Sequence, residues 1–162
     1  MSILCDTDLE KLLWGGLITP GNLDHINPAS IDICIGKTIR VEQQGRFVDL
    51  DIPPQGVVFQ PGDFALVATL ESFNVPNGYA MDLRLKSSTA RRGFDHSLAF
   101  WADPGYKGVL TMELRNVLQF NSLKIVPGER FAQVIVHKLT GLSAKPYNGK
   151  YQNATEVEGA KD

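Results

Sequence analysis

The segment "RLKSSTARRGF", residues 84–94, carries four cationic side chains, two adjacent serines and a glycine. These residue types can bind an anion, because free N–H groups at the start of a helical turn, serine hydroxyls and the flanking Lys86 and Arg91 can converge on a phosphate. They also suit an ordinary capped turn, with a serine as N-cap, arginines near the C-terminal end and Gly93 after it. A capped turn can also hold phosphate, so the segment alone supports both interpretations.

Glu113 is the second candidate for chemistry. Alternation in "GVLTMELRNV" puts Leu110, Met112 and Leu114 on one face of a strand and Glu113 on the other. Taken alone, this pattern favours a solvent-facing carboxylate paired with a cation. The alternative is a general base, which requires burial and hydrogen-bonding surroundings that adjust its pKa. The sequence by itself cannot supply those surroundings.

Other catalytic classes lack the residues they need. The histidines, His25, His96 and His137, stand far apart, and neither Cys5 nor Cys34 has the ligand spacing of zinc hydrolases or zinc deaminases. The sequence contains no GxSxG elbow, no Walker A loop and no GxGxxG fingerprint. We expect no zinc catalysis, no protein-bound metal and two reduced cysteines that serve in packing.

Composition limits the remaining possibilities. A chain of 162 residues with 43% hydrophobic content can form one domain with a core. With a formal charge of -2, the chain lacks the net positive charge of a general nucleic-acid binder. No aromatic side chains for base stacking adjoin the basic segment. No apolar run approaches the roughly 18 to 20 residues of a membrane span, and acidic residues occupy the place of a signal peptide's basic region. We therefore expect a cytoplasmic protein that binds neither nucleic acid nor membrane.

Short strands dominate the predicted secondary structure. "CDTDLEKLLWGG" predicts a short helix with a capping box from Thr7 and Glu10, ending at Gly15-Gly16. Runs rich in valine, isoleucine and phenylalanine follow, separated by Gly or Pro-Gly, as in a sandwich, barrel or jelly roll. The other candidate helix is one short turn near residues 87–92.

A weak internal repeat supports the same mainly β fold. Residues 57–68 and 123–136 each read as a strand, a Pro-Gly-acid turn and a second strand, and Pro followed by Gly suits a type II turn. The composition becomes polar near the C-terminus. We expect one domain over residues 1–162, with 143–162 as an arm or lid whose last residues are frayed.

The order of segments resembles the dCTP deaminase branch of the trimeric dUTPase superfamily. The resemblance covers nearly the whole chain and is most specific in "KSSTAR" followed by "DPGYKGVLTME"; the other matching segments are "PASIDICIG", "LVATLESFNVP", "HSLAFW", "VPGERFAQVIV" and "KPYNGKYQN". It implies a distorted jelly-roll or dUTPase-like β-barrel. It also implies a homotrimer with active sites at subunit interfaces.

The resemblance further implies a reaction, the zinc-independent hydrolytic deamination of dCTP to dUTP and ammonia, which feeds dUMP and dTTP synthesis. Mg²⁺ would bind through the triphosphate. Glu113 would be the general base that takes a proton from water and passes it to the ring N3. Ser87 and the backbone carbonyl of Ala99 would hold the water or the leaving ammonia, with Arg91 supporting the glutamate and the developing charge.

The family resemblance also assigns nucleotide-binding positions. Lys86, Ser87 and Ser88 would hold the phosphates, and Asp103 would hold the deoxyribose. The backbone of Thr111 and Met112 would hold the pyrimidine. From the arm, Tyr147 and Lys150 would close over the triphosphate, with Gln133 as a further candidate at the same end. Four features depart from the family pattern, and the first is a loop between Gly93 and His96 that is one residue shorter than in many relatives. "HSLA" replaces "HVTA", Lys86 replaces an arginine and loses its bidentate fork, and Ala154 replaces an arm glutamine for which Gln152 could substitute.

Three alternative functions stay open. A bifunctional enzyme would carry dCTP on to dUMP and diphosphate, since Asp103 and the basic segment could serve either step. A dUTPase would spare the ring, although dUTPases carry no glutamate at position 113 and end in a glycine-rich motif. A non-catalytic relative would bind dCTP, dUTP or dTTP without turnover.

Overall fold

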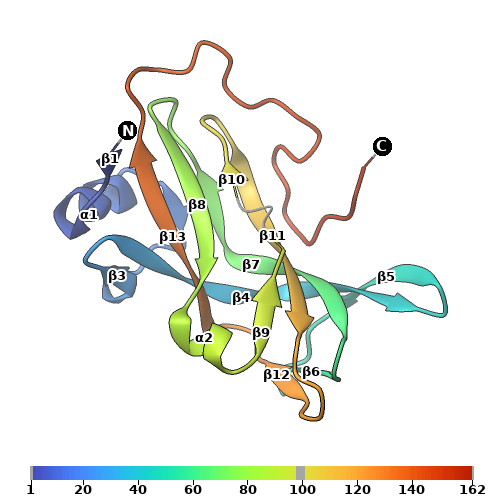
Figure 1. Ribbon diagram of the computed structural model, residues 1–162. Coiled ribbons are helices and arrows are strands. Elements are labelled where there is room, and N and C mark those ends of the chain that lie inside the picture. The colour runs from blue at the N-terminus through green and yellow to red at the C-terminus, as the bar shows by residue number, and fades with distance from the viewer. Residues whose placement is uncertain (1, 98–100, 162) are drawn as a thin grey trace.

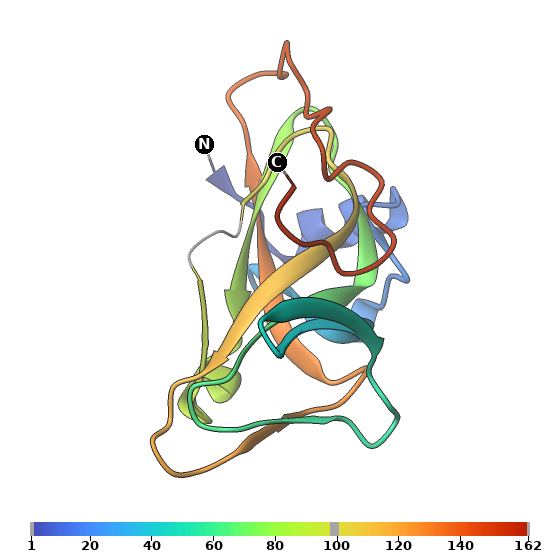
Figure 2. The same cartoon turned by 90° about the vertical axis from the view of Figure 1, so that its right-hand side faces the viewer.

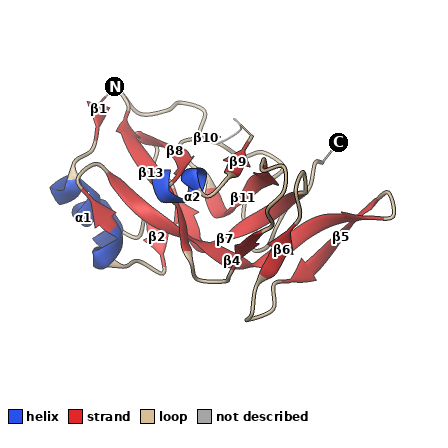
Figure 3. Cartoon of the chain, turned by 60° about the horizontal axis from the view of Figure 1, so that its bottom comes forward, coloured by secondary structure: helices blue, strands red, loops and turns tan. Residues whose placement is uncertain are grey.

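The computed structural model describes residues 2–97 and 101–161, and strands predominate in them (Figures 1 and 3). The elements in chain order are β1 (Ser2–Ile3), α1 (Asp6–Trp14), β2 (Ile18–Thr19), the 3-10 turn η1 (Leu23–His25), β3 (Ile26–Asn27), β4 (Ser30–Gln43), β5 (Arg46–Asp51), β6 (Val57–Phe59), β7 (Phe64–Asn74), β8 (Tyr79–Leu85), α2 (Ser87–Arg91), β9 (Phe94–His96), β10 (Trp101–Ala102), β11 (Lys107–Asn116), β12 (Leu123–Ile125) and β13 (Arg130–Lys138). The mainly β expectation is confirmed.

One curled sheet organises the chain. Its principal order is β10-β8-β13-β4-β7-β11-β9, with β1, β2, β3 and β5 paired at its sides. The long strand β4 pairs antiparallel with β13 through its first half and with β7 and β5 through its second half. The two halves of the curled sheet are therefore continuous through β4.

The N-terminal helix forms where it was predicted, but its cap differs. Cys5 occupies the N-cap position in an extended conformation, and its side chain makes no capping hydrogen bond. The predicted capping box of Thr7 and Glu10 is wrong, because the helix begins one residue before Thr7. Gly15 follows the last helical residue and Gly16 adopts a φ of +81°, which ends the helix as expected. No helix in the described ranges is both long and apolar enough to cross a membrane.

The internal repeat forms two equivalent corners. Asp63 N–H donates to Gln60 O at 3.0 Å, and Glu129 N–H donates to Val126 O at 3.1 Å. The intervening Gly62 and Gly128 have φ values of +84° and +80°, as the third residue of a type II turn requires. The predicted turns are confirmed, and the strands before them, β6 and β12, pair with each other.

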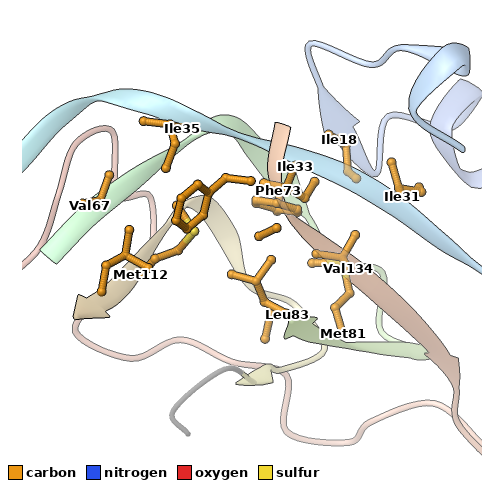
Figure 4. Close-up of a cluster of buried hydrophobic side chains, with 14 of the residues drawn as sticks. Ile18, Ile31, Ile33, Ile35, Val67, Phe73, Met81, Leu83, Met112 and Val134 are labelled. Carbon is orange, nitrogen blue, oxygen red and sulfur yellow. The ribbon is translucent and has the colours of Figure 1, made fainter. Parts of the chain in front are cut away.

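The core fills the concave side of the curled sheet. Figure 4 shows isoleucines of β4 meeting side chains of β7, β8, β11 and β13. The side chains of Phe73, Met81 and Met112 are among the largest that are fully buried. Met112 thus anchors β11 from within, in agreement with the alternation predicted for this strand.

Candidate active site

The basic segment forms the short helix α2 between β8 and β9. Its five residues confirm the predicted helical turn, and Gly93 follows with a φ of +106°. A serine was expected as the N-cap, but Lys86 takes that position and no side chain caps the helix. The serines are instead the first helical residues. Ser87, Ser88 and Arg91 are exposed, and no hydrogen bond or ion pair to another described residue occupies their side chains.

Lys86 pairs with a buried carboxylate that was not predicted from the sequence. Its Nζ donates a hydrogen bond to Asp32 Oδ2 on β4, and Asp32 is only 3% exposed. Arg130 Nη1 lies 3.6 Å from the same oxygen, while Asn27 Nδ2 donates to Oδ1 at 2.9 Å. Two cations therefore meet at one acidic side chain beside α2. An aspartate among isoleucines in "SIDICIG" was the available sequence signal.

Gln133 belongs to the same end of the sheet. It lies opposite Asp32 in the pairing of β13 with β4 and opposite Arg84 in the pairing with β8. Its Oε1 accepts a hydrogen bond from Ser30 Oγ at 2.9 Å. The structure thus brings Gln133 together with the strand end that carries Lys86.

Glu113 is a half-buried carboxylate on β11, opposite Leu66 of β7. Its Oε2 is buried and has no hydrogen-bond partner among residues 2–97 and 101–161. Burial raises the pKa of Glu113, because the charged form loses hydration. These surroundings disagree with the solvent-facing, cation-paired interpretation and suit a carboxylate held ready to accept a proton.

The helix α2 and Glu113 are connected through β9. His96 of β9 pairs with Leu114 of β11, and Ser97 N–H donates to Glu113 O at 3.2 Å. Figure 1 shows α2 and β9 together at the lower end of β11. In the described ranges, no hydrogen bond or ion pair joins the Glu113 side chain to α2. Ala99, the other expected catalytic position, lies outside the described residues.

Asp103 begins a tight turn before β11. Its carbonyl accepts a hydrogen bond from Tyr106 N–H at 3.1 Å, and Gly105 has a φ of +88°. The exposed carboxylate accepts from Trp101 Nε1 at 3.0 Å. The turn therefore fixes Asp103 at the opposite end of β11 from α2.

The C-terminal segment lies along β11, as Figure 2 shows. Val109 N–H donates to Ala154 O at 2.9 Å, and Glu158 N–H donates to Thr111 Oγ1 at 3.0 Å. Gly108 permits the close approach, since a Cβ there would lie 2.6 Å from Ala154 N. Val157 is buried against this surface, so the C-terminal segment is packed on the domain at least as far as this residue. The frayed end expected from the sequence is thereby limited to the residues after Val157.

The arm residues expected to contact the nucleotide have partners within the arm or on β11. Lys150 Nζ donates to the carbonyl of Lys161, and Tyr147 Oη accepts from Tyr151 N–H at 3.1 Å. Gln152, the substitute for the arm glutamine, accepts from Lys107 N–H at 2.9 Å and donates to Gly105 O at 2.8 Å. In this arrangement Gln152 fastens the arm to the start of β11.

A cavity of about 390 Å³ opens between β4, β6 and β7. Its lining contains none of the predicted site residues. The candidate active site is therefore a set of surfaces along β11 and α2 and does not coincide with that cavity.

Residues 3–139 match the family model described as dCTP deaminase-like. The chain belongs to this family. A dCTP deaminase from Pyrococcus furiosus is 34% identical over 90% of this chain and 90% of its own length. A dUMP-forming dCTP deaminase from Corynebacterium diphtheriae is 35% identical, over 91% of this chain and 90% of its own.

Solved structures in the deaminase and dUTPase groups share the fold. A 2'-deoxycytidine 5'-triphosphate deaminase from Agrobacterium tumefaciens matches with a TM-score of 0.69 and 22% identity, over 83% of this chain and 47% of that chain. This chain thus spans about half the length of that protein. A dUTPase of Staphylococcus bacteriophage 80alpha matches with a TM-score of 0.54 and 18% identity, over 78% and 86% of the two chains. The dUTPase-like fold class expected from the sequence is confirmed.

Proposed function

We propose that this protein hydrolyses dCTP to dUTP and ammonia, with Glu113 as the general base. The observation that carries the proposal is the half-buried carboxylate of Glu113 on β11, whose buried Oε2 has no hydrogen-bond partner among the described residues, in a chain of the dCTP deaminase-like family. A general base needs an oxygen that is free to hydrogen-bond a water molecule, and no described residue competes for Oε2.

The proposed reaction balances around one water molecule. Glu113 accepts a proton from water while the oxygen adds to C4 of the cytosine ring, and the protonated carboxyl then donates this proton to N3. The C4–N bond of the resulting tetrahedral carbon breaks, and ammonia leaves with the second proton of the water. Ser87, Arg91 and the carbonyl of Ala99 position the water and the leaving group. Positioning of this kind supplies effective concentration.

The triphosphate is assigned to the end of the sheet that carries α2. Ser87 and Ser88 offer exposed hydroxyls there, and Lys86 and Arg130 supply positive charge around Asp32. Because Lys86 and Arg130 already compensate the charge of Asp32, this carboxylate is not assigned as a metal ligand. Mg²⁺ would bind to the triphosphate oxygens instead. Magnesium commonly binds in this way, through substrate phosphates with few protein ligands.

The remaining nucleotide groups are assigned along β11 and the arm. Asp103 binds the deoxyribose, and backbone groups of Thr111 and Met112 bind the pyrimidine. Tyr147 and Lys150 close over the triphosphate, and Gln133 serves the same end. Glu113 and α2 act together across the interface of a homotrimer. The lack of any side-chain contact between them within the described part of one chain supports this assignment.

Product analysis tests the proposal directly. Incubation with dCTP and Mg²⁺ followed by chromatography is expected to show dUTP and an equal amount of ammonia. Unchanged dCTP with measurable nucleotide binding would instead identify a non-catalytic relative. Hydrolysis of dUTP alone would identify a dUTPase.

A bifunctional enzyme is the second candidate, because a relative with 35% identity is named as dUMP-forming. In that case dUMP and diphosphate would appear from dCTP in the same assay. Asp103 and the α2 serines would then serve two successive hydrolyses. Adding dUTP as a separate substrate distinguishes the two candidates, because a monofunctional deaminase leaves it intact.

A further inference from the structure

A second cluster of titratable side chains joins three elements far apart in sequence. His25 ends η1, Cys34 lies on β4 and Glu71 lies on β7. One potential ligand atom from each lies within 4.8 Å of the other two. Cys34 and Glu71 are both 3% exposed, whereas His25 is half-buried. None of the three has a role in the proposed deamination.

Glu71 is a buried carboxylate without a lysine or arginine partner among the described residues. Burial raises the pKa of Glu71, while hydrogen bonds and the charge of His25 act in the opposite direction. Its two oxygens accept from Cys34 N–H at 3.1 and 3.0 Å, and the Glu71 N–H and the Cys34 thiol also hydrogen-bond this carboxyl group. A carboxylate has about four lone-pair sites, so it can still accept a further bond beside these donors. A buried carboxylate is costly unless a cation or further hydrogen bonds compensate it.

The cysteine and histidine also offer ligand atoms, and the Cys34 thiol already hydrogen-bonds Glu71. Ile33 and Ile35 point into the core (Figure 4), so alternation turns the intervening Cys34 to the other face of β4. Its sulfur is a free thiol. The backbone carbonyl of His25 accepts a hydrogen bond from Asn27 Nδ2, whereas no hydrogen bond or ion pair with another described residue engages its ring nitrogens. Each of the three side chains thus offers an atom toward a common point.

We propose that His25, Cys34 and Glu71 bind a zinc ion in a structural site separate from the active site. Imidazole nitrogen, thiolate sulfur and carboxylate oxygen are the ligand types of zinc, while calcium and magnesium prefer oxygen alone. A dication with one thiolate, one carboxylate and a neutral imidazole forms a site with no net charge. A water molecule would complete the tetrahedral coordination.

Binding requires one proton to leave. Burial raises the pKa of Cys34 to about 12, so the metal-free protein holds a neutral thiol. As the S–Zn bond forms, the S–H proton passes to solvent and the thiolate replaces the thiol. No oxidant or reductant takes part. The metal then ties η1 to the two central strands β4 and β7.

The site connects to β11 through one side chain. Thr69 Oγ1 donates to Glu71 O at 2.8 Å and accepts from Leu110 N–H at 2.9 Å. Leu110 immediately precedes Thr111. Zinc at this cluster would therefore stabilise the backbone next to the proposed pyrimidine position without touching the nucleotide.

Cobalt(II) is the probe for the experiment, because a cobalt–thiolate bond gives a charge-transfer band in the near ultraviolet. Protein freed of metal with a chelator is titrated with CoCl₂, then with ZnCl₂. We expect one equivalent of cobalt to generate the band and zinc to abolish it. Cys34→Ser should lose the band, and Cys5→Ser, which changes the exposed cysteine, should keep it.

A second variant keeps the test valid if the buried substitution prevents folding. His25→Asn changes a half-buried side chain and should weaken cobalt affinity at least about tenfold. Zinc should raise the thermal unfolding midpoint of the unaltered protein and of Cys5→Ser, but not that of His25→Asn. Absence of a stoichiometric thiolate band in the unaltered protein, or a band unaffected by Cys34→Ser and His25→Asn, overturns the proposal.

Discussion

The backbone N–H of Ser97 donates a hydrogen bond to the carbonyl of Glu113 at 3.2 Å. The chain leaving α2 is thereby fixed against the strand of the proposed base, yet the Glu113 carboxylate makes no bond to the α2 side chains in the described residues. The proposed site shared between copies would take α2 and Glu113 from different chains.

Mixed inactive variants test this arrangement. Glu113→Gln and Ser87→Ala should each lose activity, while unfolding and refolding them together should restore part of it. In a trimer of mixed composition some interfaces pair an intact Glu113 with an intact Ser87. Steady-state deamination of the mixture is compared with each variant refolded alone. Recovery no greater than the sum of the separate variants would place the complete site within one chain.

Glu113→Gln should remove turnover and also stabilise the protein at neutral pH. A carboxyl whose pKa is raised by folding favours the folded state most when protonated, so its contribution falls as pH rises through the folded pKa. The amide removes that charge, and we expect a gain of about 1 kcal/mol or less. Thermal unfolding of both proteins at neutral and acidic pH measures it. An equal difference at both pH values would contradict a raised pKa.

The acid limb of the kcat profile should report the same group. Glu113 must be ionised to accept a proton, so kcat should fall as pH decreases through its pKa. Because burial raises this pKa, the midpoint should lie above the ordinary glutamate value of about 4.3. Circular dichroism over the same range shows whether the fold is retained. Constant kcat down to the ordinary value would remove Glu113 from the role of base.

Asp32 is expected to matter for stability far more than a surface aspartate. Asp32→Ala leaves Lys86 without its buried partner and should cost about 3 kcal/mol. Asp49→Ala is the matched control, because Asp49 pairs with Arg40 at the surface and should cost at most about 1 kcal/mol. Chemical denaturation measures both free energies of unfolding. Similar losses in the two variants would show that the Lys86 pair behaves as an exposed one.

The sequence predicted the parts of the fold that depend on local chemistry. Alternation placed Met112 in the core, and Pro-Gly pairs marked both type II turns. The capping box failed because a threonine–glutamate spacing cannot show that the helix begins one residue earlier. The sequence did not predict contacts between residues far apart in the chain, such as the one between Asp32 and Lys86, which are separated by 54 positions. The burial of Glu113 belongs to the same class, because it depends on how β11 packs.

Gly108→Ala should release the C-terminal segment from β11. A Cβ at Gly108 would lie 2.6 Å from Ala154 N, so the arm must move. If this arm closes over the nucleotide, KM for dCTP should rise about tenfold, equivalent to about 1.4 kcal/mol of lost binding. Gly45→Ala is the control, because Gly45 also has a positive φ, of +76°, but a Cβ there would meet nothing within 4 Å. Both variants should lose about 1 kcal/mol of stability from backbone strain. Steady-state kinetics that show the same KM in both variants would argue that the arm, as packed on β11, takes no part in binding.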